Sequence, residues 1–171
     1  MFILIRIFLI YLKSNFKMKY PGKELEIFDK ASFWRNYLFL LTKKYFGKKI
    51  LEVGAGIGSF TNIYKNKNLQ IYLSEIDNNN FEILKKKFLN LKEIRVEKKF
   101  IHHIEEKFDT ILYLSVLEHI ENDKKEINDA INKLDLNGHL IICVPAHNYM
   151  YSNFDKEIGH FKDMKKIFLE S

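Results

Sequence analysis

Three glycines spaced two residues apart form the part of this sequence best suited to bind a ligand. Gly54, Gly56 and Gly58 lie between a short strand predicted over residues 48–53 and a short helix predicted over residues 59–64. Glycine lets the backbone turn sharply and, because it has no Cβ, lets a ligand approach the main-chain N–H groups. The loop is therefore predicted to bind a nucleotide-like cofactor.

The spacing of the glycines distinguishes between the known types of nucleotide loop. A dinucleotide fingerprint, GxGxxG, needs its third glycine where this chain has Ser59, which disfavours a nicotinamide-dependent dehydrogenase. The GKS or GKT sequence of a phosphate-binding P-loop is also missing. The pattern that remains is GxGxG, preceded by the carboxylate of Glu52.

A second carboxylate, Glu75, follows the next predicted strand, residues 70–74. An acidic side chain at this position can accept hydrogen bonds from both hydroxyls of a ribose. The alternative is a surface acid or a helix N-cap, but Asp77 is the better cap for the helix predicted from residue 78. Glu75 is therefore the predicted ribose-binding residue.

Strands and helices alternate along the chain around these residues. Strands are predicted over residues 48–53, 70–74, 94–96, 110–117 and 139–144, with a further short one near 100–101. Helices are predicted over residues 23–46, 59–64, 78–90 and 122–134. In the first helix, Trp34, Leu38, Leu41 and Tyr45 are expected on one inward face, and Gly47 is its expected stop. This order predicts an α/β fold with a doubly wound, mainly parallel sheet and helices on both faces.

The composition fits one globular domain that works in a reducing compartment. With 171 residues, of which 47% are hydrophobic and 29% charged, the chain can bury a sizeable core, and global disorder is excluded. The net charge of +6 comes almost entirely from lysine, which disfavours a dedicated nucleic-acid reader because bidentate readout uses arginine. A single Cys143 forbids an internal disulfide, and no Cys/His spacing suits a metal. A cytoplasmic protein without a metal is expected.

Residues 1–20 differ from the rest because an apolar run, MFILIRIFLIYL, is followed by lysines. The run is too short to span a bilayer. It is interpreted as an in-plane membrane anchor, as an upstream extension of a protein that starts at Met18, or as an extra strand or helix packed on the domain. Residues 21–171 then form the main domain, which ends within a predicted amphipathic helix, so the chain is expected to be incomplete at its C-terminus.

Four ordered blocks of sequence resemble a known family. LEVGAGIGSFT, SEID, FDTILYLSVLEHIEND and LNGHLIICVPAHNYMYSNFDKEIGHF are similar to the motifs of class I S-adenosylmethionine-dependent methyltransferases. The last block resembles a bacterial subgroup associated with polyprenyl-phosphate glycosyltransferases and cell-envelope glycolipid synthesis. The resemblance implies a Rossmann-like, seven-stranded sheet. The last two strands of that sheet are expected to be missing, which would leave residues 139–144 as an edge that the apolar residues 2–12 could cover.

The resemblance also implies which residues bind the cofactor, S-adenosyl-L-methionine. The glycine loop surrounds the methionyl part, Glu52 supports the loop and the amino group, Glu75 binds the ribose and Ile76 lies against the adenine. The full set is Glu52, Gly54, Ala55, Gly56, Gly58, Glu75, Ile76, Ser115, Val116 and Leu117, of which the last three line the methyl side. The acidic residue that many relatives place against the adenine after the third strand is not evident in this chain.

The expected activity is methyl transfer to a small or lipid-linked acceptor, on oxygen. A hydroxyl acceptor benefits from a general base, and the candidates are His119, His147 and His160, with Glu118 and Asp155 as carboxylate partners. Residues 1–20 allow a peripheral membrane contact. One alternative is an inactive remnant that binds the cofactor without catalysis. Another is an RNA methyltransferase or RNA-binding domain, disfavoured because Leu117-Glu118-His119 stands where a base-amino methyltransferase carries an Asn/Asp-Pro-Pro-Tyr motif.

Overall fold

The computed structural model of this protein describes residues 6–12 and 32–145. The strands in these ranges are β1 (Arg6–Leu12), β2 (Lys49–Val53), β3 (Gln70–Ser74), β4 (Ile94–Glu97), β5 (Phe108–Leu114) and β6 (Leu134–Pro145). The α-helices are α2 (Ser32–Thr42), α3 (Thr61–Tyr64), α4 (Asn78–Phe88) and α5 (Asp123–Asn132). Short 3₁₀ turns are η1 (Lys43–Tyr45), η2 (Ile101–His103) and η3 (Leu117–His119).

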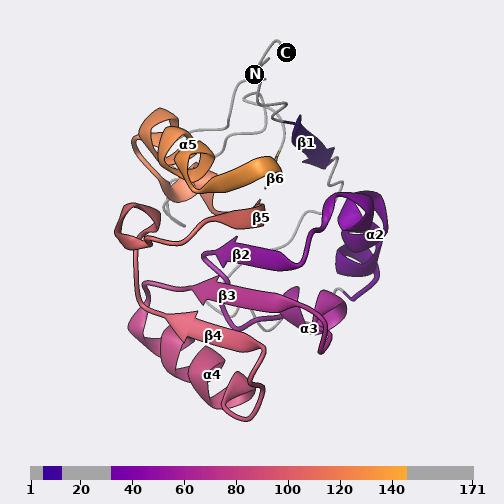
Figure 1. The fold of residues 1–171 in the computed structure, drawn as a ribbon, viewed down its shortest axis with the longest axis vertical. Helices are drawn as coiled ribbons and strands as arrows, with labels where there is room; N and C mark the ends of the chain where they lie inside the picture. The colour runs from indigo at the N-terminus through magenta and orange to yellow at the C-terminus, as the bar shows by residue number, and fades with distance from the viewer. Residues whose placement is uncertain (1–5, 13–31, 146–171) are drawn as a thin grey trace, which may run out of the picture.

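The strands form one sheet in the order β1-β6-β5-β2-β3-β4, and each pairing is parallel. They follow one another in this order from top to bottom in Figure 1. From β2 the chain winds outward through β3 to β4, and it then continues on the other side of β2 with β5 and β6. The winding direction therefore reverses between β2 and β5, at whose carboxyl ends such sheets bind ligands. The predicted doubly wound α/β fold is confirmed.

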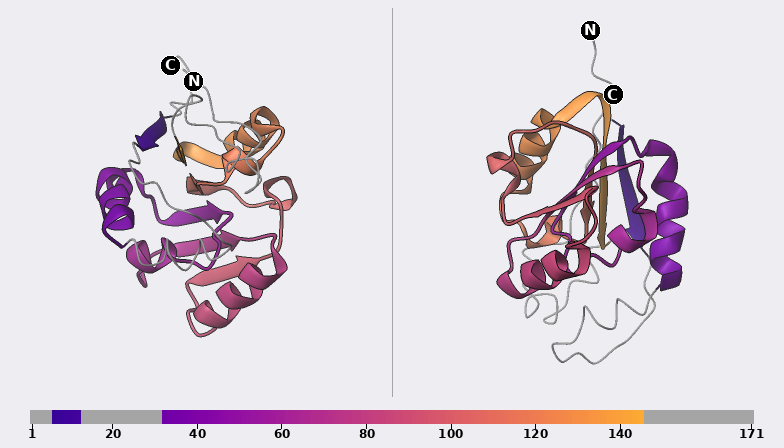
Figure 2. Two further views of the ribbon diagram at one scale, coloured as in Figure 1. Left: turned by 180° about the vertical axis from the view of Figure 1, so that it is seen from behind. Right: turned by 60° about the horizontal axis from the view of Figure 1, so that its bottom comes forward.

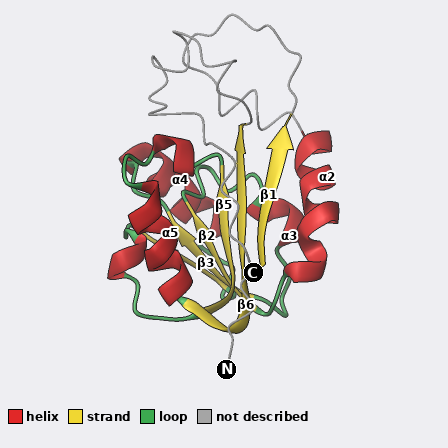
Figure 3. Ribbon diagram, turned by 90° about the horizontal axis from the view of Figure 1, so that it is seen from above, coloured by secondary structure: helices red, strands yellow, loops and turns green. Residues whose placement is uncertain are grey.

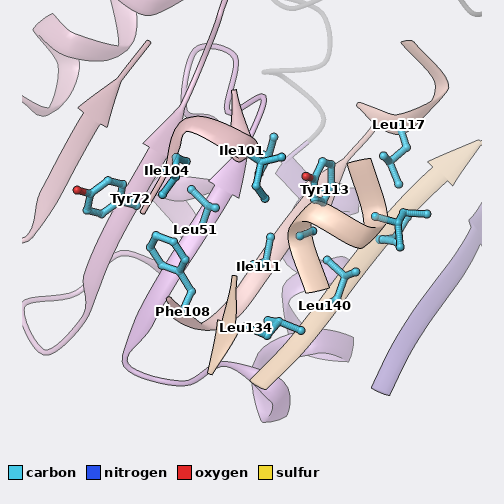
Figure 4. Close-up of a cluster of buried hydrophobic side chains, with 14 of the residues drawn as sticks. Leu51, Tyr72, Ile101, Ile104, Phe108, Ile111, Tyr113, Leu117, Leu134 and Leu140 are labelled. Carbon is cyan, nitrogen blue, oxygen red and sulfur yellow. The ribbon is translucent and has the colours of Figure 1, made fainter. Parts of the chain in front are cut away.

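Alternate side chains of the sheet enter two apolar clusters, one on each face. Leu51 and Ile111 belong to the cluster that α5, η2 and η3 cover, which is drawn in Figure 4. Ile50 and Leu112 point the other way, into the cluster covered by α2, α3 and α4. Figure 3 shows α2 and α3 on one side of the strands and α5 on the other. Because both faces are covered, the central strands carry apolar residues toward each face, as the runs Ile71–Leu73 in β3 and Ile111–Leu114 in β5 show.

Polar caps begin two of the helices where the sequence predicts helix starts. The side chain of Asp77 accepts a hydrogen bond from the backbone N–H of Asn80 (2.9 Å), as expected for the N-cap of α4. Asn122 does the same for the N–H of Lys125 (3.1 Å) at the start of α5. Each cap satisfies an N–H group that the helix itself leaves unpaired.

Some predicted elements have different bounds in the structure. The strand predicted over residues 110–117 ends at Leu114 because Ser115 has a φ of 56°, which is not a strand conformation. The helix predicted to end at residue 134 ends at Asn132, since Leu134 instead begins β6 by pairing with β5. The prediction of a short strand near residues 100–101 is wrong, because the 3₁₀ turn η2 begins at Ile101.

The inward face of α2 also differs from the prediction. Leu38 is buried and Trp34 and Tyr45 are half-buried, but Leu41 is 40% exposed. Thr42, four residues after Leu38, is buried in its place, and its hydroxyl donates to the carbonyl of Leu38 (2.8 Å). A threonine is tolerated there because this bond satisfies its hydroxyl. The predicted part of the helix before residue 32 lies outside the described residues.

Strand β1 covers the edge of β6, which would otherwise be exposed. Arg6 pairs with His139 and Leu12 with Pro145, so the whole of β1 lies alongside β6 in parallel register. Residues 6–12 are thus an extra strand packed on the domain, and the rest of residues 1–20 lies outside the described residues. A covered edge matters here because unpaired apolar strands tend to associate with other chains. No helix in the described ranges is long and apolar enough to cross a membrane.

Candidate functional site

The predicted cofactor residues gather at the carboxyl ends of β2, β3 and β5. The glycine loop follows β2, Glu75 follows β3, and Ser115 and Val116 follow β5. The first two loops are joined by the N–H of Ala55, which donates to the carbonyl of Ser74 (3.1 Å). On the other side, a Cβ on Gly54 would lie 2.6 Å from the side chain of Val116. Three segments far apart in the sequence thus meet at the switch point of the sheet.

The glycine loop has the backbone conformation that its composition predicts. Gly54, Gly56 and Gly58 have φ values of 64°, 56° and 71°, in the left-handed region that disfavours residues with a Cβ. The N–H of Gly58 donates to the carbonyl of Ala55 (2.9 Å), which closes the turn. The loop is therefore held in one shape, with its amide groups along the edge of the sheet.

Gly58 is also where the loop packs against α4. A Cβ at this position would lie 2.5 Å from the ring of Phe88 and 2.8 Å from Leu84, both of which are buried. We expect Gly58→Ala to lower the free energy of unfolding by about 2 kcal/mol, through the positive φ and the crowding. Urea unfolding of both chains measures this difference. In a Phe88→Leu background the cost should be smaller, and a loss below about 0.5 kcal/mol in the original background would contradict the steric explanation.

Glu75 links the glycine loop to the start of α4. Its Oε2 accepts the N–H of Gly56 (2.7 Å), and its Oε1 accepts the N–H of Asp77 (2.8 Å). The side chain is 94% buried, since its relative exposure is 6%. Each carboxylate oxygen has a further lone pair beyond the one that accepts the backbone N–H. Glu75 is therefore not the surface acid or N-cap of the alternative interpretation, and its ribose role stays a prediction.

Glu52 lies beneath the loop in a buried hydrogen-bonded cluster. Its Oε2 accepts the hydroxyls of Thr61 (2.7 Å) and Tyr64 (2.8 Å), both from α3. Burial raises the pKa of Glu52 from 4.5 to about 7, against the opposing effects of these two hydrogen bonds and of the positive charge of Lys87. The carboxyl group therefore changes charge near neutral pH, immediately before the residues predicted to bind the methionyl part.

The remaining predicted cofactor residues differ in what they can offer a ligand. Ile76 is 49% exposed just after Glu75, as expected for a side chain that lies against an aromatic base. Ser115 is exposed and Val116 half-buried. Leu117 is fully buried in the cluster that Figure 4 shows, so its backbone rather than its side chain would face a bound molecule. Their contacts with a cofactor stay predictions.

The candidate general base His119 and its carboxylate partner Glu118 differ in how exposed their side chains are. His119 is exposed in η3, whereas Glu118 beside it is 2% exposed. Burial, with the nearby negative charge of Glu118, raises the pKa of the Cys143 thiol to about 12. His147, Asp155 and His160 lie outside the described residues. Of the candidates that the structure describes, His119 is therefore the one with an exposed side chain.

Sequence reasoning missed the residues that support the loop from below. Thr61 and Tyr64 hold Glu52, and the ammonium of Lys87 donates to the carbonyl of Ile57 (2.8 Å). No motif identifies them, because a hydroxyl or lysine becomes significant only when the fold brings it to the loop. The spacing of Thr61 and Tyr64, three residues apart on one face of a helix that follows the loop, was the available signal.

The arrangement has counterparts among solved structures at low sequence identity. A S-adenosylmethionine-dependent methyltransferase from Clostridium acetobutylicum is 21% identical over 70% of this chain and 55% of its own, with a TM-score of 0.56. The N-methyltransferase NodS from Bradyrhizobium japonicum, in complex with S-adenosyl-L-homocysteine, is 18% identical over 67% of this chain and 61% of its own (TM-score 0.56).

Coclaurine N-methyltransferase, bound to N-methylheliamine and S-adenosyl-L-homocysteine, is 20% identical over 77% of this chain and 38% of its own (TM-score 0.58). The chain thus spans 38% to 61% of the length of these three structures. At these identities the likeness establishes the fold. Comparison with curated protein sequences gives no match.

Residues 26–167 match the sequence model of a family described as a methyltransferase domain. The match includes the glycine loop, Glu75 and the loop after β5, which the structure brings together at the switch point of the sheet. The chain belongs to this methyltransferase-domain family.

Proposed function

We propose that this protein binds S-adenosyl-L-methionine at the carboxyl ends of β2, β3 and β5 and transfers its methyl group to a small or lipid-linked acceptor, on oxygen. The observation that carries the proposal is the carboxylate of Glu75, which is hydrogen-bonded to Gly56 of the glycine loop and buried at the switch point. A ribose bound by Glu75 places the rest of a nucleoside cofactor along the loop. The similar structures bound to S-adenosyl-L-homocysteine support this choice of cofactor.

Methyl transfer requires the protein mainly to position the acceptor next to the methyl group. When bound, the cofactor supplies a methyl group on a sulfonium, which is a good leaving group. The acceptor oxygen forms the new bond to the methyl carbon, the carbon–sulfur bond breaks, and S-adenosylhomocysteine leaves. The protein aligns the two and excludes water. His119, exposed in η3 beside the predicted methyl side, is proposed to take the proton of the acceptor hydroxyl.

Fewer observations support the proposed acceptor than support the proposed cofactor. Coclaurine N-methyltransferase, with N-methylheliamine bound, supports a small organic acceptor for this fold. The lipid-linked option and the choice of oxygen are proposed from the motif after β6, whose residues lie outside the described ranges. A location in the cytoplasm of a bacterium is proposed on the same motif and on the lone, buried Cys143.

Titration calorimetry of the full chain with S-adenosylhomocysteine tests the proposal. We expect one site with a dissociation constant of about 1–100 µM, in the usual range for enzyme ligands, and no detectable binding of NAD, because Ser59 replaces the third glycine of the dinucleotide loop. Absence of S-adenosylhomocysteine binding by folded protein would contradict the proposal. Binding without methyl transfer to hydroxyl acceptors would favour a noncatalytic cofactor-binding protein.

A further inference from the structure

Helix α2 carries an apolar stripe, Phe33, Tyr37, Leu40 and Leu41, that faces away from the protein. These side chains are 86%, 51%, 59% and 40% exposed, respectively. Their spacing of four, three and one residues places them on one side of the helix, next to the side that carries the buried Leu38. An amphipathic helix that packs on a core ordinarily presents polar residues outward, so α2 is apolar on both of its faces.

The stripe lies at the outer side of the described fold. In both panels of Figure 2, α2 runs beside β1 at the margin of the molecule, and no described element lies over its outer face. Soluble proteins seldom expose several large apolar side chains side by side unless the surface binds a partner. The stripe is therefore a candidate docking surface.

The charges around the stripe indicate what kind of partner it fits. Residues 32–49, which include the whole of α2, contain five basic residues and no acidic one, although the chain has 22 acidic residues in all. The basic residues are Arg35, Lys43, Lys44, Lys48 and Lys49. Lys43 and Lys44 follow α2 directly in η1, and the ammonium of Lys44 lies 4.9 Å from the centroid of the Tyr45 ring. An apolar helix face that leads into lysines is typical of segments that lie on anionic membranes.

A wide pocket adjoins this basic end. It has a volume of about 340 Å³, and its lining includes Lys44, Lys48, Asn137 and His139. Asp109 also lines it, but Oδ2 of that carboxylate accepts two backbone N–H groups of the segment after Gly47 (2.9 and 2.8 Å). The pocket thus combines two lysines and an asparagine with this carboxylate, which is already hydrogen-bonded to the backbone.

We propose that the outer face of α2 docks on the surface of an anionic lipid bilayer. The apolar stripe enters the headgroup region, and the lysines that follow it contact lipid phosphates. This inference goes beyond the proposed methyl transfer and does not depend on it. It also differs from a contact through residues 1–20, because β1 is already paired with β6 in the sheet.

Vesicle flotation of the full chain tests this surface. The vesicles contain phosphatidylcholine alone or with about 30% phosphatidylglycerol, enough to give a negative surface potential. We expect partition to the anionic vesicles that weakens strongly when salt is raised from about 0.1 M to 0.5 M, because screening shortens the reach of the lysines. The double variant Phe33→Ser, Leu40→Ser should partition at least about tenfold less, since two apolar side chains no longer leave water.

The matched control is the double variant Ile83→Ser, Leu89→Ser. These residues are 48% and 72% exposed at α4, which also carries three lysines but lies at the opposite end of the sheet. We expect it to change partition by less than about twofold. Circular dichroism and S-adenosylhomocysteine titration of both variants verify that each remains folded.

Four outcomes would overturn the proposal. These are no partition of the unchanged chain to anionic vesicles, equal loss in both double variants, equal partition to both kinds of vesicle, or a stripe variant that partitions normally. A dimer of the unchanged chain that the stripe variant dissociates, seen by sedimentation equilibrium, would assign the stripe to a second copy instead. Cross-links from α2 to residues 13–31 that compete with vesicles would assign it to the chain's own segment.

Discussion

Replacing Glu75 by glutamine is expected to weaken the binding of S-adenosylhomocysteine by at least tenfold. The amide keeps the shape of the side chain, but it removes the charge that strengthens hydrogen bonds from ribose hydroxyls, which are worth about 1.5–3 kcal/mol to a charged group. It also loses one of the two bonds to the N–H groups of Gly56 and Asp77, because the amide NH2 is a donor where the carboxylate has a second acceptor oxygen. Calorimetric titration of the variant and the unchanged chain measures the loss, and Glu75→Ala should lose at least as much.

A neighbouring carboxylate provides the control for this effect. Glu97 ends β4, next to the strand that Glu75 follows, and its backbone carbonyl accepts the N–H of Glu75 (3.2 Å). Glu97→Gln leaves that backbone contact in place, so the affinity should stay within about threefold of the original. An unchanged affinity in folded Glu75→Gln would refute the ribose assignment, while leaving open whether the cofactor binds elsewhere along the loop.

The second large effect concerns the stability of the fold and its dependence on pH. Because burial raises the pKa of Glu52 to about 7, the folded state holds this proton while the unfolded state releases it near 4.5. The stabilisation from the bound proton is complete below the unfolded pKa and is lost as the pH rises through about 7. One pKa unit corresponds to about 1.4 kcal/mol, so the loss between pH 4.5 and 8 is about 3 kcal/mol.

Glu52→Gln makes this loss measurable. An amide oxygen can still accept the hydroxyls of Thr61 and Tyr64, and it never becomes a buried charge. Relative to the unchanged chain, the free energy of unfolding of the variant should therefore rise by about 2.5 kcal/mol between pH 5 and pH 8. Urea unfolding at several pH values gives the difference. The exposed Glu121→Gln serves as the control, and its curve should run parallel to that of the unchanged chain.

The same substitution is expected to impair binding while it stabilises the fold. Glu52 precedes the segment predicted to bind the amino group of the cofactor, and an ionised carboxylate attracts an ammonium that an amide does not. A variant that is more stable at pH 8 and binds S-adenosylhomocysteine less tightly would show that the buried charge is kept for function. A flat difference in stability between pH 5 and 8 would instead mean that Glu52 titrates near its ordinary pKa.

The glycine loop and the doubly wound fold could be predicted because both depend on local properties. Glycine is the residue that takes a positive φ most readily, and Gly54, Gly56 and Gly58 all have one. Apolar runs bounded by turns predict buried parallel strands whatever their neighbours are. The N-cap of α4 at Asp77 follows from the same local rules.

Element bounds and inward faces were less predictable because they depend on partners. Leu134 reads as the last residue of a helix, but pairing with Phe108 makes it part of β6. Leu41 fits the helical period of α2 and still lies outward, because the sheet beneath the helix has room for Leu38 and Thr42 instead. Periodicity gives a face of a helix, whereas the packing of neighbouring elements selects the side chains on that face that are buried.

The amino-acid sequence by itself determined the fold class, the glycine loop and the acidic residue that follows the next strand, because backbone sterics and hydrophobic periodicity act over a few residues. Only the tertiary structure decided that β1 covers β6, that Thr61 and Tyr64 share one oxygen of Glu52, and that the apolar stripe of α2 faces outward. Each of these depends on distances between residues far apart in the chain or on what covers them. Such distances are set by the folded sheet and not by any local pattern.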